Sequence, residues 1–554
     1  MPLTSFSEYR LKNKICQRIL FLVVILNGFY VSTSFISCTQ KAGSQVPFVE
    51  VLNTENEGDV RLIKALRSYI PHVVKDKGTP GLNIALARQG KIIWEAGFGY
   101  ANLEKMTTMI PQTVCHSGSM GKAYTSTAIM QLVEKGVLGL DESINDYLKD
   151  FKIVNPLGDR EITIKDLLTH SSGLSSNTAH PDFKPPKPLG EHLKFRYSQK
   201  NFQSYNETLI PLWSTKVGKV FQYSNLGMAT LGYLVEETNP EGLSFSEYVQ
   251  QHIMNPLGMS SSQYPPVQDA EHVRPDIFER LSTGYARWGA VDIPTPTMYF
   301  ADYPAGTVVT IPGDHIKLLL AYLNKGTYND YQLLKPDTVE LMLTPQIDAF
   351  GGSVKLGLMW LLANVDQIDY NFSHGGAHMY GWNNDFKAYP KLDFAVAVFT
   401  NHWSLPVVDR ENVLIADFIA SWLKNEQRFS GTGESFLSWV WKTSYVIGLL
   451  FTEQIKGMLG VKSPITEDMI EAMAKGAKFR PDDYNSISGW DPDGFRAGVR
   501  DMLDTEMTVK GINKFLRSDK IRVTKEELKK IYHELGGGSG SPYFFILEQY
   551  LREK

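Results

Sequence analysis

Ser119-Met120-Gly121-Lys122 is the stretch that decides how this chain of 554 residues is interpreted. It opens a run, from Ser119 to about Gly136, whose apolar spacing predicts an amphipathic helix. Positions i and i+3 share one face of a helix, so the Lys122 side chain should reach the Ser119 hydroxyl. A serine hydroxyl is a weak nucleophile until a neighbouring base takes its proton. The pair therefore predicts a nucleophilic serine, although Ser421-Trp422-Leu423-Lys424 repeats the same spacing.

A second motif, Tyr223-Ser224-Asn225, follows downstream. A lysine ammonium favours a neighbouring phenolate, so we expect Tyr223 to take the serine proton and later to protonate the leaving group. Asn225 is expected to hydrogen-bond Lys122 and a substrate amide. The same Tyr-x-Asn spacing occurs at Tyr100-Ala101-Asn102 and Tyr322-Leu323-Asn324, where a strand tyrosine or a core aromatic is the better interpretation.

The third motif is Ser373-His374-Gly375-Gly376-Ala377, which we expect just before a strand. Adjacent glycines at a strand edge let a substrate approach the backbone closely. On this interpretation the backbone N–H groups of Ala377 and Ser119 form an oxyanion hole. Taken alone, the motif is better explained as a plain glycine turn with a histidine in solvent.

In this order the three motifs resemble the serine β-lactamase and penicillin-binding protein superfamily, in its branch of class C β-lactamases, DD-peptidases and related esterases. The resemblance covers roughly residues 60–425, and the Ser421 motif has no Tyr-x-Asn after it. Further segments resemble sequences typical of this superfamily and occur in the same order along the chain: residues 162–174, 255–259, 304–306 and 397–401.

The resemblance implies an α+β fold, in which an antiparallel sheet is flanked by helices and carries an inserted all-helical subdomain. It also implies that Ser119 is the acylated nucleophile, that Lys122 and Tyr223 are the base system, and that no cofactor or metal is needed. The substrate would be a small-molecule or peptide ester or amide. The positions that contact it, by the same resemblance, are Asn225, His374, Gly376 and Ala377.

The third motif departs from the family pattern. β-Lactamases and many penicillin-binding proteins carry Lys-Thr-Gly where this chain has His374-Gly375-Gly376, so a fixed cation and a hydroxyl that help to hold a substrate carboxylate are absent. Histidine is cationic only near or below a pKa of about 6.5. We therefore rank an esterase or peptidase first, a cell-wall DD-peptidase second and a true β-lactamase third. A non-catalytic envelope binding protein on the same fold is the alternative from another class.

The order of predicted elements supports the same fold, because strands at both ends enclose a helical middle. An amphipathic helix is expected at 59–76, and a hairpin is expected from strands at 81–87 and 91–99. A helical run opens at Pro312, and a closing helix is expected at 409–425. Further strands are expected at 356–362, 381–389 and 394–400, which gives a hydrolase domain at 59–428 and a mainly helical C-terminal extension at 434–554.

The N-terminus has the plan of an export signal at residues 1–37. Basic residues precede the apolar stretch 19–26, and a small and polar zone ends at Cys38. Cys38 resembles the lipidated cysteine of a bacterial lipoprotein, which predicts a lipid anchor in the cell envelope and a tether at 38–58. A transmembrane or buried helix is the alternative, but the apolar stretch is short for a membrane span.

Composition excludes several other classes. The net charge of −4 and the lack of a basic stripe argue against nucleic-acid binding. Of three cysteines, Cys16 and Cys38 lie in or at the signal, so Cys115 has no partner for a disulfide in the folded part. A group of histidines lacks metal-ligand spacing and is interpreted as structural or surface: His116, His170, His315, His378 and His402.

Overall fold

A computed structural model describes residues 46–175, 185–203, 209–288, 291–296, 299–352, 354–365, 369–378, 381–403, 411–429 and 521–534, with Ala497 and Arg517. The predicted signal, Cys38 and nearly all of the 434–554 extension lie outside these residues, so those predictions stay untested. The unit that carries the motifs comprises residues 46–287 and 292–554. In the described part of the chain, no helix is long and apolar enough to cross a membrane.

The core of this unit is an antiparallel sheet, which among the described residues has ten strands in the order β1-β3-β2-β18-β17-β16-β15-β14-β13, with β4 beside β3. β18 lies near its middle and is buried at every position, as its continuous apolar sequence predicts. The strands are β1 (Phe48–Leu52), β2 (Gly81–Arg88), β3 (Lys91–Asn102), β4 (Thr107–Thr108), β13 (Ile347–Ala349), β14 (Val354–Leu356), β15 (Leu361–Val365), β16 (Asp369–His378), β17 (Trp382–Tyr389) and β18 (Phe394–Thr400).

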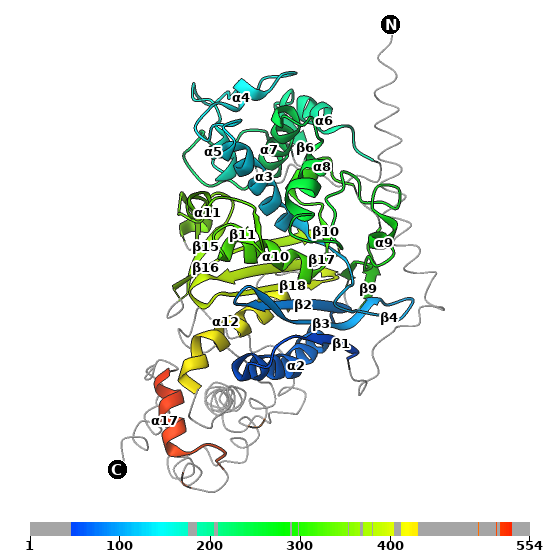
Figure 1. The fold of residues 1–554 in the computed structure, drawn as a ribbon, viewed down its shortest axis with the longest axis vertical. Helices are drawn as coiled ribbons and strands as arrows, with labels where there is room; N and C mark the ends of the chain where they lie inside the picture. The colour runs from blue at the N-terminus through cyan, green and yellow to red at the C-terminus, as the bar shows by residue number, and fades with distance from the viewer. Residues whose placement is uncertain are drawn as a thin grey trace, which may run out of the picture. The chain divides into compact units, whose positions relative to one another are not determined.

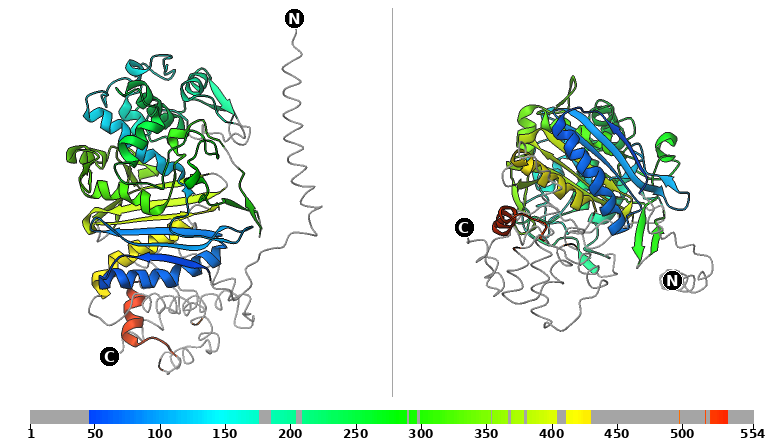
Figure 2. Two further views of the ribbon diagram at one scale, coloured as in Figure 1. Left: turned by 45° about the vertical axis from the view of Figure 1, so that its right-hand side comes forward. Right: turned by 90° about the horizontal axis from the view of Figure 1, so that it is seen from below.

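Helices cover both faces of the sheet (Figures 1 and 2). On one face α2 (Glu57–Lys77) packs against α12 (Glu411–Phe429), where the rings of Tyr69 and Phe418 stack 4.3 Å apart. The other face is covered by α10 (Pro312–Leu323), which contacts β2 and β18. These layers confirm the α+β class, the N-terminal hairpin and the closing helix.

The helical subdomain lies between β5 (Cys115–His116) and α10, and its central helix is α3 (Lys122–Glu134). α3 is buried on nearly every side because α7 and α8 pack around it, so the expected amphipathic pattern is wrong. Its hydroxyls bond to carbonyls instead of water, as Thr125 does to Pro304 O at 2.6 Å. The remaining helices here are α4 (Ile144–Tyr147), α5 (Ile164–Leu168), α6 (Leu189–Tyr197), α7 (Asn225–Thr238), α8 (Phe245–Val249), η2 (Gln250–Met254) and α9 (Pro275–Phe278).

Short elements complete the described fold. The helical ones are η1 (Gly118–Gly121), η3 (Tyr303–Ala305), α11 (Pro336–Met342), η4 (Phe350–Gly352), η5 (Pro390–Leu392) and α17 (Lys525–Glu534). The short strands are β6 (Asn201–Gln203), β7 (Leu209–Pro211), β8 (Tyr285–Trp288), β9 (Val291–Pro294), β10 (Val309–Thr310), β11 (Thr327–Tyr328), β12 (Tyr331–Gln332) and β19 (His402–Trp403).

Two predicted segments are corrected. The tether at 38–58 is wrong for its second half, because β1 pairs with β3 and the Phe48 ring stacks on Phe98 at 4.8 Å. The strand at 356–362 is in fact two strands, β14 and β15, separated by a turn in which Met359 has a φ of +77°. The Met359 N–H leaves the sheet and donates to Leu168 O at 3.1 Å. Tertiary contacts thus override local preference at both places.

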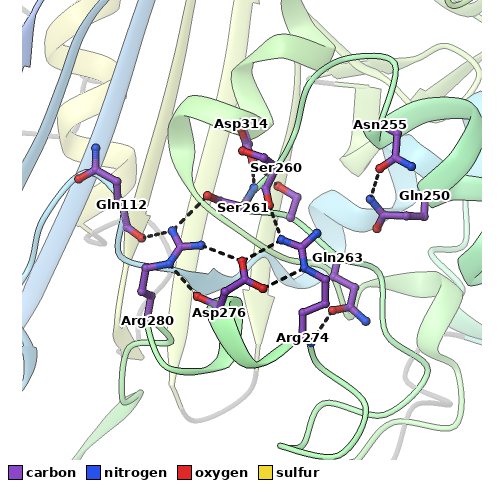
Figure 3. A network of polar contacts seen from close by, with 11 residues as sticks. Gln112, Gln250, Asn255, Ser260, Ser261, Gln263, Arg274, Asp276, Arg280 and Asp314 are labelled. Carbon is purple, nitrogen blue, oxygen red and sulfur yellow. Dashed lines mark hydrogen bonds and ion pairs between the residues drawn. The ribbon is translucent and has the colours of Figure 1, made fainter.

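A network of polar contacts holds the segment of chain that precedes the first motif (Figure 3). Arg280 donates to the carbonyl oxygen of Gln112 and to the Ser261 hydroxyl, each at 3.1 Å. Asp276 pairs with Arg274 at 2.9 Å, and Asp314 accepts from the Ser261 N–H at 2.7 Å. The network ties the loop that enters β5 to α9 and α10, and so positions the chain just before Ser119.

Candidate active site

Ser119 lies in the turn η1, between β5 and α3. The turn begins at Gly118, whose φ is +59° and whose Cα lies against the backbone of Ala377, since a Cβ there would come within 2.7 Å of Ala377 N. Only glycine satisfies both conditions without strain. The Ser119 side chain is half-buried, and the turn presents it to the elements that carry the other two motifs.

Lys122 is the first residue of α3 and is fully buried. Its Nζ donates to Ser119 Oγ at 2.9 Å and to Ala305 O at 2.6 Å. Burial holds the pKa of Lys122 well below the usual value for lysine, while the Asp302 carboxylate raises it. A neutral amine beside the serine oxygen is able to accept its proton.

Tyr223 faces the same pair of residues from the start of α7. The Lys122 Nζ lies 4.8 Å from the centroid of its ring. Burial raises the pKa of Tyr223 above its usual value, and a hydrogen bond with Ser119 only partly lowers it. This raised pKa disfavours the expected phenolate and favours a phenol that keeps its proton near neutral pH.

Asn225 begins α7, and among the described residues no hydrogen bond joins it to Lys122 as expected. The hydrogen bonds of Lys122 go to Ser119 and Ala305. The Oδ1 atom of Asn225 is buried and has no hydrogen-bond partner among the described residues. Buried polar atoms are normally paired, so this oxygen is an acceptor available to an N–H of a bound molecule.

The third motif lies inside β16, not before a strand as expected. A Cβ at Gly376 would overlap the carbonyl oxygen of Ser117, so β16 runs directly over the turn that carries Ser119. Ala377 is exposed, and its backbone lies beside Gly118. The backbone of Ala377 therefore lies beside the turn that carries Ser119.

His374 is buried, which rules out a histidine in solvent on a plain glycine turn. Its Nδ1 lies 2.6 Å from Gly375 O, so this nitrogen carries the proton and donates it to the carbonyl. Burial, together with repulsion from Lys122 when that amine is protonated, lowers the pKa of His374 to about 4. At neutral pH this position carries no cation.

The repeat of the first motif, at Ser421 to Lys424, lies in α12. α12 packs on the opposite face of the sheet from α10 and α3, in the cluster that contains Trp422 and Leu423. None of the other motifs reaches that face. Cys115 is equally inert, because burial raises the pKa of its thiol to about 12.

Sequence analysis missed three contributions. The carbonyl of Ala305 holds Lys122, the buried Asp302 raises the pKa of Lys122 while bonding His192 at 2.8 Å, and His170 packs on Tyr223. All three residues lie in or near segments that resemble sequences typical of the superfamily, but the sequence alone assigns them no role. Within the described ranges, no group of three or more metal-ligating side chains is assembled.

This fold and this arrangement of residues are typical of the β-lactamase type of serine hydrolase. The chain belongs to the beta-lactamase family, whose model matches residues 66–419. That family includes amidases, esterases and penicillin-binding proteins as well as β-lactamases.

Curated relatives are distant. The chain is 27% identical over 387 residues to an N-acetylmuramyl-L-alanine amidase of Bacillus subtilis (strain 168), which covers 63% of this chain and 83% of the relative. It is 28% identical over 201 residues to the protein flp of Staphylococcus aureus (strain MW2), with 36% of this chain and 37% of that protein covered.

Solved structures share the fold. The octameric penicillin-binding protein homologue from Pyrococcus abyssi matches with a TM-score of 0.54 and 25% identity, over 65% of this chain and 77% of that one. EstCE1, a hydrolase with promiscuous acyltransferase activity, matches with a TM-score of 0.54 and 20% identity, over 65% of this chain and 99% of that one. A class C β-lactamase matches with a TM-score of 0.53 and 16% identity, over 66% of this chain and 98% of that one. The last two show the fold alone.

Proposed function

We propose that this protein hydrolyses an ester or amide through an acyl-enzyme on Ser119. The observation that carries the proposal is the buried Lys122 amine, 2.9 Å from the Ser119 hydroxyl. A lysine desolvated in this way, with its pKa lowered, is a base suited to activating a serine.

In the acylation step, Lys122 takes the Ser119 proton as Oγ bonds to the substrate carbonyl carbon. The oxyanion that forms is stabilised by the N–H groups of Ser119 and Ala377, and such donors contribute about 10²–10³ in rate. The phenol of Tyr223 donates its proton to the leaving oxygen or nitrogen as that bond breaks, and Lys122 returns a proton to Tyr223. Water then attacks the acyl carbon and gives a proton to Lys122. The bond between that carbon and Ser119 Oγ breaks as Lys122 returns the proton to Oγ, which releases the acid and free Ser119.

The substrate class follows from the third motif. A neutral His374 cannot form the charge-assisted contact that a lysine makes with a substrate carboxylate. This supports an ester or amide without that carboxylate over a β-lactam or a DD-peptide, which remain the second candidates. The amidase among the relatives supports testing amide bonds first.

The test is covalent labelling with a fluorophosphonate probe. Wild type and Ser421→Ala, the matched control from the repeated motif, are expected to be labelled, whereas Ser119→Ala is not. A substrate panel of esters, muramyl-alanine amides, D-amino-acid peptides and nitrocefin then ranks the chemistry. Folded wild type that resists every acylating probe would instead favour the non-catalytic envelope binding protein.

The proposal extends to location. The basic and apolar leader and Cys38 support export and attachment to an envelope membrane by a lipid on that cysteine. In a bacterial host, Cys38→Ser is expected to move the protein from the membrane fraction to the soluble fraction. Equal membrane recovery of both forms would contradict the lipid anchor.

A further inference from the structure

His170 occupies an unusual position at the edge of the site. It follows α5, is 2% exposed, and has a φ of +52°, a left-handed conformation that side-chain-bearing residues seldom adopt. Backbone strain of this kind persists where surrounding contacts fix it, and it clusters at functional sites. The contacts that fix His170 are therefore informative.

Apart from the bond of the His170 N–H to Leu167 O at 3.2 Å, these contacts go to the segment from Phe221 to Ser224. The carbonyl oxygen of His170 accepts from the Gln222 N–H at 2.6 Å, and its Nδ1 accepts from the Ser224 N–H at 3.3 Å. Its ring lies on the ring of Tyr223, with 4.5 Å between centroids and 46° between planes. One residue thus holds the backbone on both sides of Tyr223 and the phenol ring itself.

The bond from Ser224 sets the protonation of the ring. An imidazole nitrogen that accepts a hydrogen bond carries no proton, so the proton lies on Nε2 and the ring is neutral. Burial, together with repulsion from Lys122 and His374 when these are protonated, lowers the pKa of His170 well below its usual value, which is consistent with this form. Ser224 also caps α7, since its Oγ accepts from the Gly227 N–H at 3.2 Å.

We infer that His170 is a positioning residue, whose neutral side chain and left-handed backbone hold the phenol of Tyr223 against Ser119. The inference rests on the proposed acyl transfer, and it assigns His170 no contact with substrate. Its effect should appear in the rate of the chemical step, because displacing an acid–base group by about 1 Å costs roughly 10²-fold.

The test compares His170→Gly with His170→Asn. Both residues tolerate a positive φ, so the pair differs in the side chain and not in backbone strain. Asparagine retains an oxygen acceptor near the place of Nδ1, whereas glycine removes both the acceptor and the ring. We expect His170→Gly to lower kcat by about 10–100-fold with KM little changed, and His170→Asn to recover a large part of that loss.

Two further readouts separate positioning from general damage. The pH dependence of kcat/KM should shift in His170→Gly, because the hydrogen bond between Tyr223 and Ser119 is disturbed. His402→Gln is the matched control, since His402 is equally buried but bonds Glu411 at 2.8 Å and none of the site residues. That control is expected to lose stability and keep the wild-type pH profile.

The outcomes are distinct for the two proposals. Equal kcat and pH profile in wild type and His170→Gly would overturn the positioning role while leaving the hydrolase intact. If His170→Asn were as impaired as His170→Gly in folded protein, the acceptor contact would not be the cause and the inference would fail. Folded wild type without any acylation would remove the proposed function itself.

Discussion

At the scale of single residues, the chemistry of this site depends on desolvation. Burial lowers the pKa of Lys122, which forms no ion pair with a carboxylate among the described residues, and burial raises the pKa of Tyr223. The two shifts move the two pKa values apart, so the lysine loses its proton more readily and the tyrosine keeps its own. This difference supports the proposed roles of Lys122 as the base and Tyr223 as the acid.

The first prediction concerns Asp302, whose carboxylate raises the pKa of Lys122. Asp302→Asn removes that charge, so Lys122 should become neutral at lower pH, and the acid limb of Ser119 acylation should move to lower pH. The measurement is the rate of fluorophosphonate labelling across pH 4–9. His192→Gln, which keeps the carboxylate but changes its 2.8 Å partner, is the control. An acid limb unmoved or moved upward in Asp302→Asn would contradict the assignment of Lys122 as base.

At the scale of elements, the site depends on how closely β16 approaches the turn that carries Ser119. Adjacent glycines in this strand differ sharply in their surroundings. A Cβ at Gly376 would overlap Ser117 O and meet Met120 Cγ at 2.8 Å, whereas the nearest atom to a Cβ at Gly375 is Asn384 O at 3.8 Å. Only the first position requires glycine for close packing.

This difference gives a matched pair of variants. Gly376→Ala should push β16 away from the Ser119 turn, lower the free energy of unfolding by roughly 1–3 kcal/mol and strongly slow acylation. Gly375→Ala should change the free energy of unfolding by less than about 0.5 kcal/mol. Urea unfolding with labelling kinetics measures both. Comparable stability and labelling of the two variants would show that the strand and the turn are less tightly packed than described.

At the scale of the whole molecule, buried histidines make the free energy of unfolding depend on pH. Burial lowers the pKa of His374 and His378 to about 4 and of His315 to about 3. In the unfolded chain these rings bind protons below about pH 6.5. Lowering the pH from 6.5 toward 4 therefore favours unfolding, and above pH 7 the effect vanishes because both states are neutral.

The expected size of this effect is testable by urea unfolding at a series of pH values. Each of the three histidines should contribute a slope of about 1.4 kcal/mol per pH unit in that window. His378→Gln, in which an amide nitrogen can replace the bond of Nε2 to Gln268 at 3.1 Å, should flatten the dependence by about one such slope. An unchanged dependence in this variant would mean that His378 is protonated in the folded protein.

The sequence alone predicted much of this protein, because its signals are local or ordered along the chain. The apolar run of β18, the hairpin of β2 and β3 and the three motifs in order were sufficient to indicate the fold and to favour Ser119 over Ser421. It did not predict the burial of α3 on all sides, the division of the segment at 356–362 into β14 and β15, or the strand β1. Those depend on neighbours that are distant in sequence.

What the motifs by themselves determined is which serine, lysine and tyrosine belong together. Only the tertiary structure decided how they are charged and held. The lowered pKa of Lys122, the protonated phenol of Tyr223 and the neutral ring of His374 all follow from burial. His170 contacts Tyr223 and Ser224 because the fold brings together two segments about 50 residues apart in the sequence. Desolvation and long-range contacts have no local sequence signal, and this is why the structure was needed to assign base and acid.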